Sequence, residues 1–501
     1  MKSIRHLAIV TGILCGTMAD ADVTAQQVWN NWTEQMAFYG QKFTNVGEDL
    51  SGNTLTVSGV KIQMSDEEAA IVAKLGDIVL TENSDGTVDI TMGNTFPIKV
   101  DLTPQYGDPA TVNMTLSQSN MVLKVSGAPD TMIYDFSADS YGIRVDSIEG
   151  DKSVEFVDVA IIMLDLSGNF SVSKDTLTNI AYFFNMGALD INAHFNEMDQ
   201  GGIFQANADI ADLSMFANIV IPIDKNLDTK IPSFSDDLAV KGGYSFGETA
   251  YSFDYDVVND TGSGSASIKD GNLNFTFDMD GVAYNSEARG IDVNLSIPNK
   301  FPFPLHASMA NYGFEVLVPL SQGRDGPRDA RLAFNLTDLT ISELLWNIAD
   351  PTAVLPRDPV TFAFGVDAQV TPFFDFLDPT QQEAAMMSNI PGEVNGVQIS
   401  ELTVRGAGAE ITGDGAFTFN NTDLQTFDGF PRPEGQATFT INGINGLVEK
   451  LIKIGLIPAD QAMLPRMMLG MFTTSVGADT LTSTIKVNAE GHVLANGQRL
   501  R

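Results

Sequence analysis

The sequence is almost without cysteine. Cys15 is the only cysteine in 501 residues. A cleavage site for a signal peptide is expected beyond it, after Ala21, so the mature chain would contain no cysteine at all. Disulfide bonds and thiol chemistry are therefore excluded for the mature protein, although an exported location would permit disulfides.

Basic residues are scarce as well. The chain has 28 lysines and arginines against 64 aspartates and glutamates, which gives a formal net charge of −36. Such a charge repels nucleic acid and anionic lipid headgroups, and no basic stripe offsets it. The composition argues against a nucleic-acid partner.

Long apolar runs are missing beyond the start of the chain. No later segment approaches the ~18 uninterrupted apolar residues of a transmembrane helix, so the mature chain is expected to have none. The start has the form of a signal peptide, with Lys2 and Arg5 before apolar Leu7–Cys15 and a small-x-small site at Ala19–Ala21. The sequence predicts a signal peptide over residues 1–21 and a periplasmic protein.

Motifs for catalysis, cofactors and metals are lacking too. There is no Gly-x-Gly-x-x-Gly and no Walker A sequence, and the histidines have no metal-ligand spacing. Gly243–Gly247 reads Gly-x-Ser-x-Gly, but a strand pattern follows it where a nucleophilic serine needs a helix. We therefore expect a non-enzymatic protein with no catalytic residue, no cofactor and no metal.

Two pairs of aspartates keep an alternative open. Asp254 with Asp256, and Asp278 with Asp280, are two positions apart, so on a strand each pair shares one face. Two carboxylates on one face are a start towards a Ca²⁺ site or an acid–base pair. Solvated acidic side chains are the plainer interpretation. The alternative function is a secreted hydrolase or a calcium-dependent protein that uses this acidic face.

The sequence does have a sustained alternation of apolar and polar residues. In its first third, strand-like segments recur about every 8–12 residues, as in an antiparallel meander. Ile78–Leu80 with Val88–Met92, and likewise Val112–Leu116 with Met121–Val125, flank short polar turns as hairpin strands do. Alternating strands have one wet face and one buried face, which indicates antiparallel rather than parallel sheets.

The clearest alternation is central. Tyr251, Phe253 and Tyr255 point to one side of a strand, and Phe275 and Phe277 repeat the pattern after a glycine-containing turn. The intervening positions are polar and often acidic. The pattern predicts a half-buried sheet with an aromatic inner surface and an acidic outer one.

Few segments have a helical pattern. Near the mature start, Thr24–Tyr39 has a candidate N-cap at Thr24 and apolar residues Val28, Trp32 and Met36 on one face. The other predicted helices are Thr176–Phe184, Ile341–Ile348, Gln381–Ser388, Ile444–Ile454 and Ala459–Phe472. A weak recurrence links Ala208–Ala217, Phe334–Ile348 and Thr438–Ile452, each read as a strand that ends in Asp or Gly before an apolar helix start.

The stretch Val397–Gly497 combines the clearest strands with the last two helices, and its methionines recur at helical spacing. Methionine adapts to irregular shapes, so this surface suits an apolar ligand or a partner, although core packing is the plainer interpretation. The candidate apolar-ligand surface joins these helices to the central aromatic residues. Its members are Tyr251, Phe253, Tyr255, Phe275, Phe277, Leu447, Leu451, Met463, Met467 and Met471.

Two segments carry a family resemblance. Val23–Trp32, which reads VTAQQVWNNW, and Ile485–Gly497, which reads IKVNAEGHVLANG, resemble the start and close of the exported bacterial proteins grouped as domain of unknown function 2125. The resemblance covers essentially the whole mature chain and implies no established activity.

A more distant resemblance concerns Phe439–Val448, which reads FTINGINGLV and is similar to strand-to-helix units of AsmA-like envelope proteins. This resemblance implies a long β-sheet curved into an apolar groove and a role in lipid handling. AsmA-like proteins usually keep an N-terminal membrane anchor, whereas a signal peptide is expected here. Neither resemblance supplies catalytic residues.

Together these patterns predict a mainly β protein, with large antiparallel meander sheets in a groove-like or sandwich architecture and a few short helices. We expect a β-rich lobe over 22–235 and a second over 236–501, or one continuous sheet. The expected function is binding of an apolar ligand such as lipid, or support of cell-envelope assembly, with an envelope protein as a further expected partner. An outer-membrane β-barrel is a third interpretation, although the chain ends in Gln498–Arg501 rather than in an aromatic strand.

Overall fold

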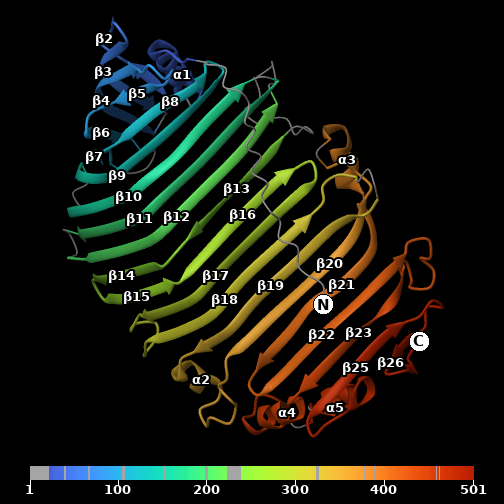
Figure 1. The fold of residues 1–501 in the computed structure, drawn as a ribbon. Coiled ribbons are helices and arrows are strands. Elements are labelled where there is room, and N and C mark those ends of the chain that lie inside the picture. The colour runs from blue at the N-terminus through green and yellow to red at the C-terminus, as the bar shows by residue number, and fades with distance from the viewer. Residues whose placement is uncertain are drawn as a thin grey trace.

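One antiparallel sheet contains all the strands that the structure describes (Figure 1). The computed structural model describes residues 22–38, 41–65, 68–103, 108–150, 154–174, 176–197, 201–222, 238–322, 326–376, 378–388, 390–458, 460–461 and 463–501. The predicted signal peptide, with Cys15, and Tyr39 lie outside the described residues. The predicted class, mainly antiparallel β with a few short helices, is confirmed.

The strands differ widely in length. They are β1 (Lys42–Thr44), β2 (Gly47–Ser51), β3 (Thr54–Ser65), β4 (Ala69–Glu82), β5 (Val88–Thr91), β6 (Thr95–Leu102), β7 (Ala110–Ser119), β8 (Val122–Ala128), β9 (Thr131–Glu149), β10 (Val154–Lys174), β11 (Leu177–Glu197), β12 (Ile203–Pro222), β13 (Ala239–Phe246), β14 (Thr249–Val257), β15 (Asp260–Ile268), β16 (Asp270–Asp278), β17 (Gly281–Ser296), β18 (Leu305–Val318), β19 (Arg328–Ile341), β20 (Val360–Pro372), β21 (Gly392–Gly406), β22 (Ala409–Asn420), β23 (Arg432–Asn442), β24 (Thr474–Ser475), β25 (Thr480–Val487), β26 (Val493–Ala495) and β27 (Gln498–Arg499). The longest are β9 to β12.

Five helices accompany the sheet in the described part of the chain. They are α1 (Ala25–Phe38), α2 (Glu343–Ala349), α3 (Pro379–Met387), α4 (Ile444–Lys453) and α5 (Met463–Phe472). Each overlaps a predicted helix, and the N-cap at Thr24 is confirmed because the Gln27 N–H donates to Thr24 Oγ1 at 3.3 Å. Within these residues no helix is long and apolar enough to cross a membrane.

The sixth predicted helix, Thr176–Phe184, is wrong. This segment belongs to β11, where Tyr182 pairs with Phe170 and Phe184 pairs with Gly168 on the neighbouring strand. Apolar residues occupy both faces of the strand here, Phe183 among them, so the period of two is obscured in the sequence. Pairing with β10 therefore makes this segment a strand despite its helix-like apolar pattern.

The meander is regular beyond β9, because most strands pair with the strand that follows them in sequence. β13 and β14 both pair with β12, and β15 and β16 both pair with β17, so each couple acts as one long strand. Since β12 precedes residue 223 and β13 follows residue 237, the sheet is continuous between the two parts of the chain that the sequence divides near residue 236.

The short strands near the N-terminus pair less simply. The predicted hairpin of Ile78–Leu80 with Val88–Met92 is confirmed, since β4 pairs with β5 and Leu80 lies opposite Ile90. The predicted hairpin of Val112–Leu116 with Met121–Val125 is wrong. β7 and β8 both pair with the long β9, which keeps them apart along its length.

Each long strand from β9 to β19 is interrupted once near its middle. In four strands the interrupting residue has a positive φ, namely Asp165 (49°) in β10, Asp212 (50°) in β12, Gly290 (61°) in β17 and Asp338 (54°) in β19. The register of β10 with β11 is the same on both sides of Asp165, because both strands are interrupted at this level. The breaks therefore line up across the sheet.

Such a break changes which residues share a face. An ordinary strand residue directs its N–H and C=O to the same neighbouring strand, whereas a left-handed residue directs them to opposite ones. The alternation of faces is then reversed. The residue that follows the break shares a face with the residue two positions before the break. These pairs are apolar: Met163 and Leu166 in β10, Ile210 and Leu213 in β12, Leu336 and Leu339 in β19.

The two faces of the sheet consequently differ along its whole length. We call the face that carries Met132 and Tyr134, and that packs on α1, the inner face, and the opposite one the outer face. The outer face is mostly polar, with exceptions such as Phe183, and holds ion pairs between neighbouring strands, for example Arg144 with Asp158 at 2.8 Å. The inner face is apolar on both sides of the breaks.

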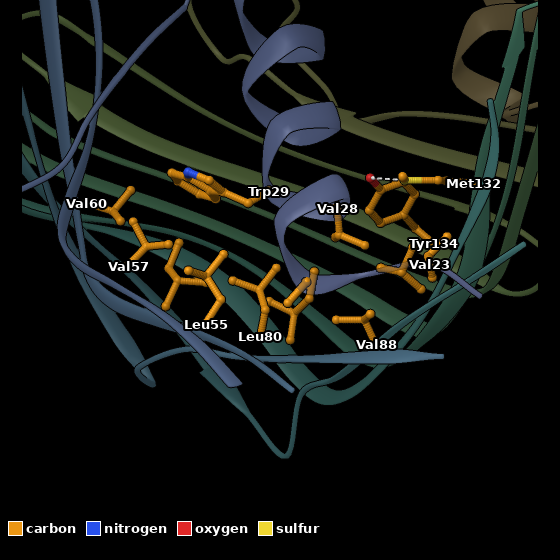
Figure 2. Packing of buried hydrophobic residues seen from close by; sticks show 14 residues of the cluster. Val23, Val28, Trp29, Leu55, Val57, Val60, Leu80, Val88, Met132 and Tyr134 are labelled. Carbon is orange, nitrogen blue, oxygen red and sulfur yellow. Dashed lines mark hydrogen bonds between the residues drawn. The ribbon is translucent and has the colours of Figure 1, made fainter. Parts of the chain in front are cut away.

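The fully buried core lies at the N-terminal end of the sheet (Figure 2). There the strands curve under α1, and the helix lays Val28 and Trp29 against Leu55, Val57 and Leu80. The Trp29 indole N–H donates to Glu48 Oε1 at 3.0 Å, so the buried ring keeps a hydrogen bond. This cluster closes the inner face at one end.

Removing apolar volume from this core is expected to destabilise the protein. Leu80→Ala should lower the free energy of unfolding by about 2–5 kcal/mol, because Leu80 is fully buried and a cavity remains. Leu50→Ala, at a leucine that is 58% exposed, should change it by less than about 0.5 kcal/mol. Urea unfolding of both variants checks this, and equal losses would contradict the placement of the core.

Candidate functional site

The candidate site is the inner face of the sheet from β9 to β25. The break divides each long strand into two arms, and both arms contribute apolar side chains. On one arm the register places Phe170, Tyr182 and Met215 on successive strands. On the other arm Ile161 and Ile191 are neighbours in the same way. The faces of the two arms join at the breaks.

Aromatic rings form contacts along the inner face. Phe334 of β19 lies 5.9 Å, ring centre to ring centre, from both Tyr312 of β18 and Phe362 of β20. Towards the N-terminus, Phe170 and Tyr182 are 5.0 Å apart. Tilted and edge-on pairs at such distances are favourable beyond the area they bury. The rings thus fix one another in a surface rather than in a closed core.

Glycines make room for some of these rings. Phe253 and Tyr255 of β14 lie opposite Gly264 and Gly262 of β15. A Cβ atom at Gly262 would come within 2.6 Å of Tyr255 Cε1, and one at Gly264 would overlap the Phe253 ring. Each ring therefore lies across the neighbouring strand, which broadens the apolar surface there.

Much of the inner face is not covered by the described residues. Several inner-face side chains from β10 to β21 are between 37% and 46% exposed, namely Ile161, Phe204, Met215, Tyr244, Tyr251, Val293, Val318, Leu332, Phe362 and Val404. Among the helices, α1 packs on β1, β3 and β4, and α4 packs on β22. Contiguous apolar patches of this kind are uncommon on monomeric proteins and mark interaction or ligand sites.

Burial near α1 affects two tyrosines. Burial raises the pKa of Tyr134, whose hydroxyl donates to Asn31 Oδ1 of α1 at 2.9 Å. Burial also raises the pKa of Tyr141, which follows the break in β9. Both phenols stay neutral at physiological pH, so this end of the inner face carries no charge from them.

The structure places the five central residues of the predicted ligand surface on the inner face, but on different arms. Tyr251, Phe253 and Tyr255 belong to β14, while Phe275 and Phe277 belong to β16. β14 pairs with β12 and β15, and β16 pairs with β13 and β17, so the two groups are not cross-strand neighbours.

The other five predicted residues lie on the C-terminal helices, apart from the central aromatic residues (Figure 1). Leu447 and Leu451 of α4 are half-buried beside the buried Val448. The three methionines of α5 are open to solvent, with exposures of 75% for Met463, 60% for Met467 and 51% for Met471. Plain core packing, the ordinary interpretation of this methionine run, does not describe α5.

The acidic pairs are not gathered into a centre. Asp278 Oδ1 accepts the backbone N–H of Asp280, forming the turn after β16, and Asp280 pairs with Arg328 at 2.8 Å. Asp254 and Asp256 are exposed on the outer face of β14. Across the described ranges, no group of three or more His, Cys, Asp and Glu side chains is arranged to hold a metal ion.

The sequence patterns considered above do not predict the break, although the spacing of apolar residues contains a signal for it. Apolar positions two apart become three apart around an aspartate or glycine, as in Ile210-Ala-Asp-Leu213 and Leu336-Thr-Asp-Leu339. Two of the three segments in the weak recurrence contain these aspartates. Asp212 does not end its strand, contrary to that prediction, because β12 continues to Pro222.

Comparison with known proteins adds no relative. No protein-family model matches the chain. No curated protein sequence matches it either. The resemblance to domain of unknown function 2125 therefore stays a prediction from the sequence, and the function has to be argued from the inner face.

Filling the space above Gly264 tests the ring placement. Gly264→Val should destabilise the protein by about 1–3 kcal/mol, because the Phe253 ring would have to move. Combined with Phe253→Ala, the loss should be smaller than the sum of the single losses. Gly47→Val is the control, since a strand glycine with open space beside it imposes no clash. Additive losses in urea unfolding would contradict the predicted contact.

A second prediction concerns the start of α4, whose N-cap Gly443 has no side chain to cap it. The side chain of Asp479, the residue before β25, caps the helix instead. The Gly446 N–H donates to its Oδ2 at 3.0 Å, and the Asn445 N–H donates to its Oδ1 at 3.2 Å. Burial acts to raise the pKa of Asp479, but these hydrogen bonds outweigh it and lower the pKa below its ordinary value. The stabilisation is therefore present above about pH 4 and is lost as the pH falls through the lowered pKa.

Asp479→Asn should make the α4 amides exchange about fivefold faster at neutral pH, as loss of a helix cap does. The difference from the natural chain should shrink as the pH falls through the lowered pKa of Asp479. Asp460→Asn, at an exposed aspartate of the loop between α4 and α5, serves as the control and should exchange like the natural chain. A difference that is constant with pH would rule out the capping role.

Proposed function

We propose that the protein is a non-enzymatic binder of apolar ligands in the periplasm, and that lipid acyl chains are the ligand class it holds on its inner face. The observation that carries the proposal is the continuity of the apolar inner face, which stays partly exposed from β10 to β21. Solvent-exposed apolar area of this extent is unfavourable unless a ligand or partner covers it for part of the time.

The dimensions of the inner face support acyl chains. Strand rows lie about 4.8 Å apart, so the rows from β9 to β25 extend over about 60 Å. The hydrocarbon core of a bilayer is only about 30 Å thick. An inner face of this length accommodates several acyl chains, and its lining is mostly aromatic and aliphatic.

The charge distribution supports the same proposal. The outer face carries acidic residues and ion pairs, which keep a protein with so much apolar surface in solution. The short helices add no catalytic constellation, and the acidic pairs belong to a turn and to the outer face. Support of cell-envelope assembly fits the proposal as the setting in which such a binder would act.

The test compares two phenylalanines of similar exposure on opposite faces. Phe204 of β12 is 39% exposed on the inner face, and Phe183 of β11 is 41% exposed on the outer face. Phe204→Ser should weaken binding of a fluorescent fatty acid about tenfold, because about 1.4 kcal/mol of apolar contact is lost. Phe183→Ser removes the same side chain and should leave the affinity unchanged.

Lipid that co-purifies with the natural protein, identified by mass spectrometry after extraction, is the expected companion result. The proposal fails if purified, folded protein carries no lipid and does not bind the probe. It also fails if the two serine variants weaken binding equally, since the inner face would then have no special role.

A further inference from the structure

Helix α5 exposes an unusual amount of apolar surface for a soluble protein. Its described side chains are all exposed apart from the half-buried Leu469 and Phe472. Met463 at 75%, Met467 at 60% and Leu464 at 59% are among the most exposed large apolar side chains of the molecule. The helix lies along one long edge of the sheet, next to α4 (Figure 1). The end of α5 lies over the inner face of β25, because Ser483, which pairs with Phe439, donates to the Phe472 carbonyl.

The exposed large apolar residues of α5 form one broad stripe. At 100° per residue, they span an arc of about 140° on the helix surface. The half-buried Leu469 and Phe472 fall outside this arc, on the side towards the sheet. The helix therefore has two apolar sides, one used for packing and one presented to solvent. The members of the solvent stripe are Met463, Leu464, Met467, Met468 and Met471.

The stripe is held in place rather than loosely attached. At the end of α5 the Phe472 carbonyl accepts Ser483 Oγ of β25 at 2.7 Å and Asn496 Nδ2 at 3.0 Å. At its start, Arg466 lies 3.9 Å from Glu449 of α4. Val448 anchors α4 as a buried residue. These contacts fix the orientation of the stripe, which points away from the protein.

The charge around the stripe differs in sign from the rest of the chain. Residues 444–473 contain three basic residues and two acidic ones, whereas the whole chain has a net charge of −36. Lys453 of α4 and Arg466 of α5 are both exposed. This is the arrangement of a helix that lies in a membrane interface, with apolar side chains in the acyl region and long cationic side chains reaching the headgroups.

We propose that α5 docks on a lipid bilayer that contains anionic lipid, inserting its methionine stripe at the headgroup boundary. The charge decides for this occupant. The acidic remainder of the molecule is repelled by anionic headgroups, whereas residues 444–473, which include α4 and α5, have a formal charge of the opposite sign. Methionine side chains are flexible enough to fill the irregular space between lipid chains.

This inference stands apart from the proposed function. Acyl-chain binding depends on the inner face, whereas bilayer docking depends on α5. The two can fail separately, because probe binding in solution measures the first and vesicle binding measures the second. If both hold, docking brings the inner face to the membrane from which its ligands come.

The test is flotation of the full chain with vesicles of phosphatidylcholine alone and of phosphatidylcholine with phosphatidylglycerol. The natural protein should float with the mixed vesicles and less with the neutral ones, and added salt should reduce the difference. Met463→Gln, Met467→Gln and Met471→Gln combined should reduce binding about tenfold, because the change keeps side-chain size but removes the apolar stripe. Lys453→Glu with Arg466→Glu should abolish the preference for phosphatidylglycerol.

Helix α3 offers a matched control. Met386 and Met387 are 86% and 75% exposed, but the segment 375–388 contains the acidic residues Asp375, Asp378 and Glu383 and no basic residue. Met386→Gln with Met387→Gln should bind vesicles like the natural chain. Circular dichroism should be unchanged in all variants, and the melting temperature should be unchanged in the glutamine variants, since every side chain altered there is exposed.

Two outcomes overturn the proposal outright, and a third counts against it. One is a folded natural protein that floats with neither kind of vesicle, whatever protein it binds instead. The other is equal vesicle binding by the natural chain and the α5 glutamine variant. Loss of binding in the α3 variant to the same extent would also count against it, since exposed methionine alone would then be sufficient.

Discussion

The constraint on which the rest of the structure depends is the aligned break in the long strands. A strand of about twenty residues with an uninterrupted period of two would keep one face apolar only if every second residue were apolar. Here the period slips once in each long strand, and a left-handed Asp165, Asp212, Gly290 or Asp338 takes up the slip in four of them. Because neighbouring strands slip at the same level, the register survives and one face stays apolar across both arms.

A sheet built this way has little enclosed core. Its buried cluster is confined to the N-terminal end, where α1 packs on β3 and β4. Beyond that end, stability rests on ladder hydrogen bonds, ring contacts on the inner face and ion pairs on the outer one, each cross-strand pair adding about 0.2–1 kcal/mol. Because the sheet encloses little core, many of its apolar side chains remain partly exposed. Apolar-ligand binding is thus proposed as a consequence of the architecture rather than of any single pocket.

The sequence predicts the class and the helices that have local signals, such as the Thr24 cap and the apolar spacing of α4 and α5. It fails where the signal is not local. Apolar residues on both faces of β11 imitate a helix, and the pairing of β7 with β9 depends on a strand that follows later in the chain. The alternation of apolar and polar residues predicts the aromatic part of the candidate site. At Asp212 the sequence predicts a strand end, whereas the structure has a break within a continuous strand. Exposure of α5 is invisible in sequence, because a methionine-rich helix has the same pattern in a core and on a surface.

The most direct test of the account is a nitroxide scan through the break in β10. A mature chain without cysteine would allow single cysteines to be placed one at a time from Val159 to Phe170 and labelled. With a bound fatty acid carrying a paramagnetic relaxation agent, labels at Val159, Ile161 and Met163 should be strongly relaxed, and beyond Asp165 the relaxed positions should shift to Leu166 and Phe170. An alternation that continues from Met163 to Ser167 and Asn169 without a shift would contradict a single apolar face across both arms.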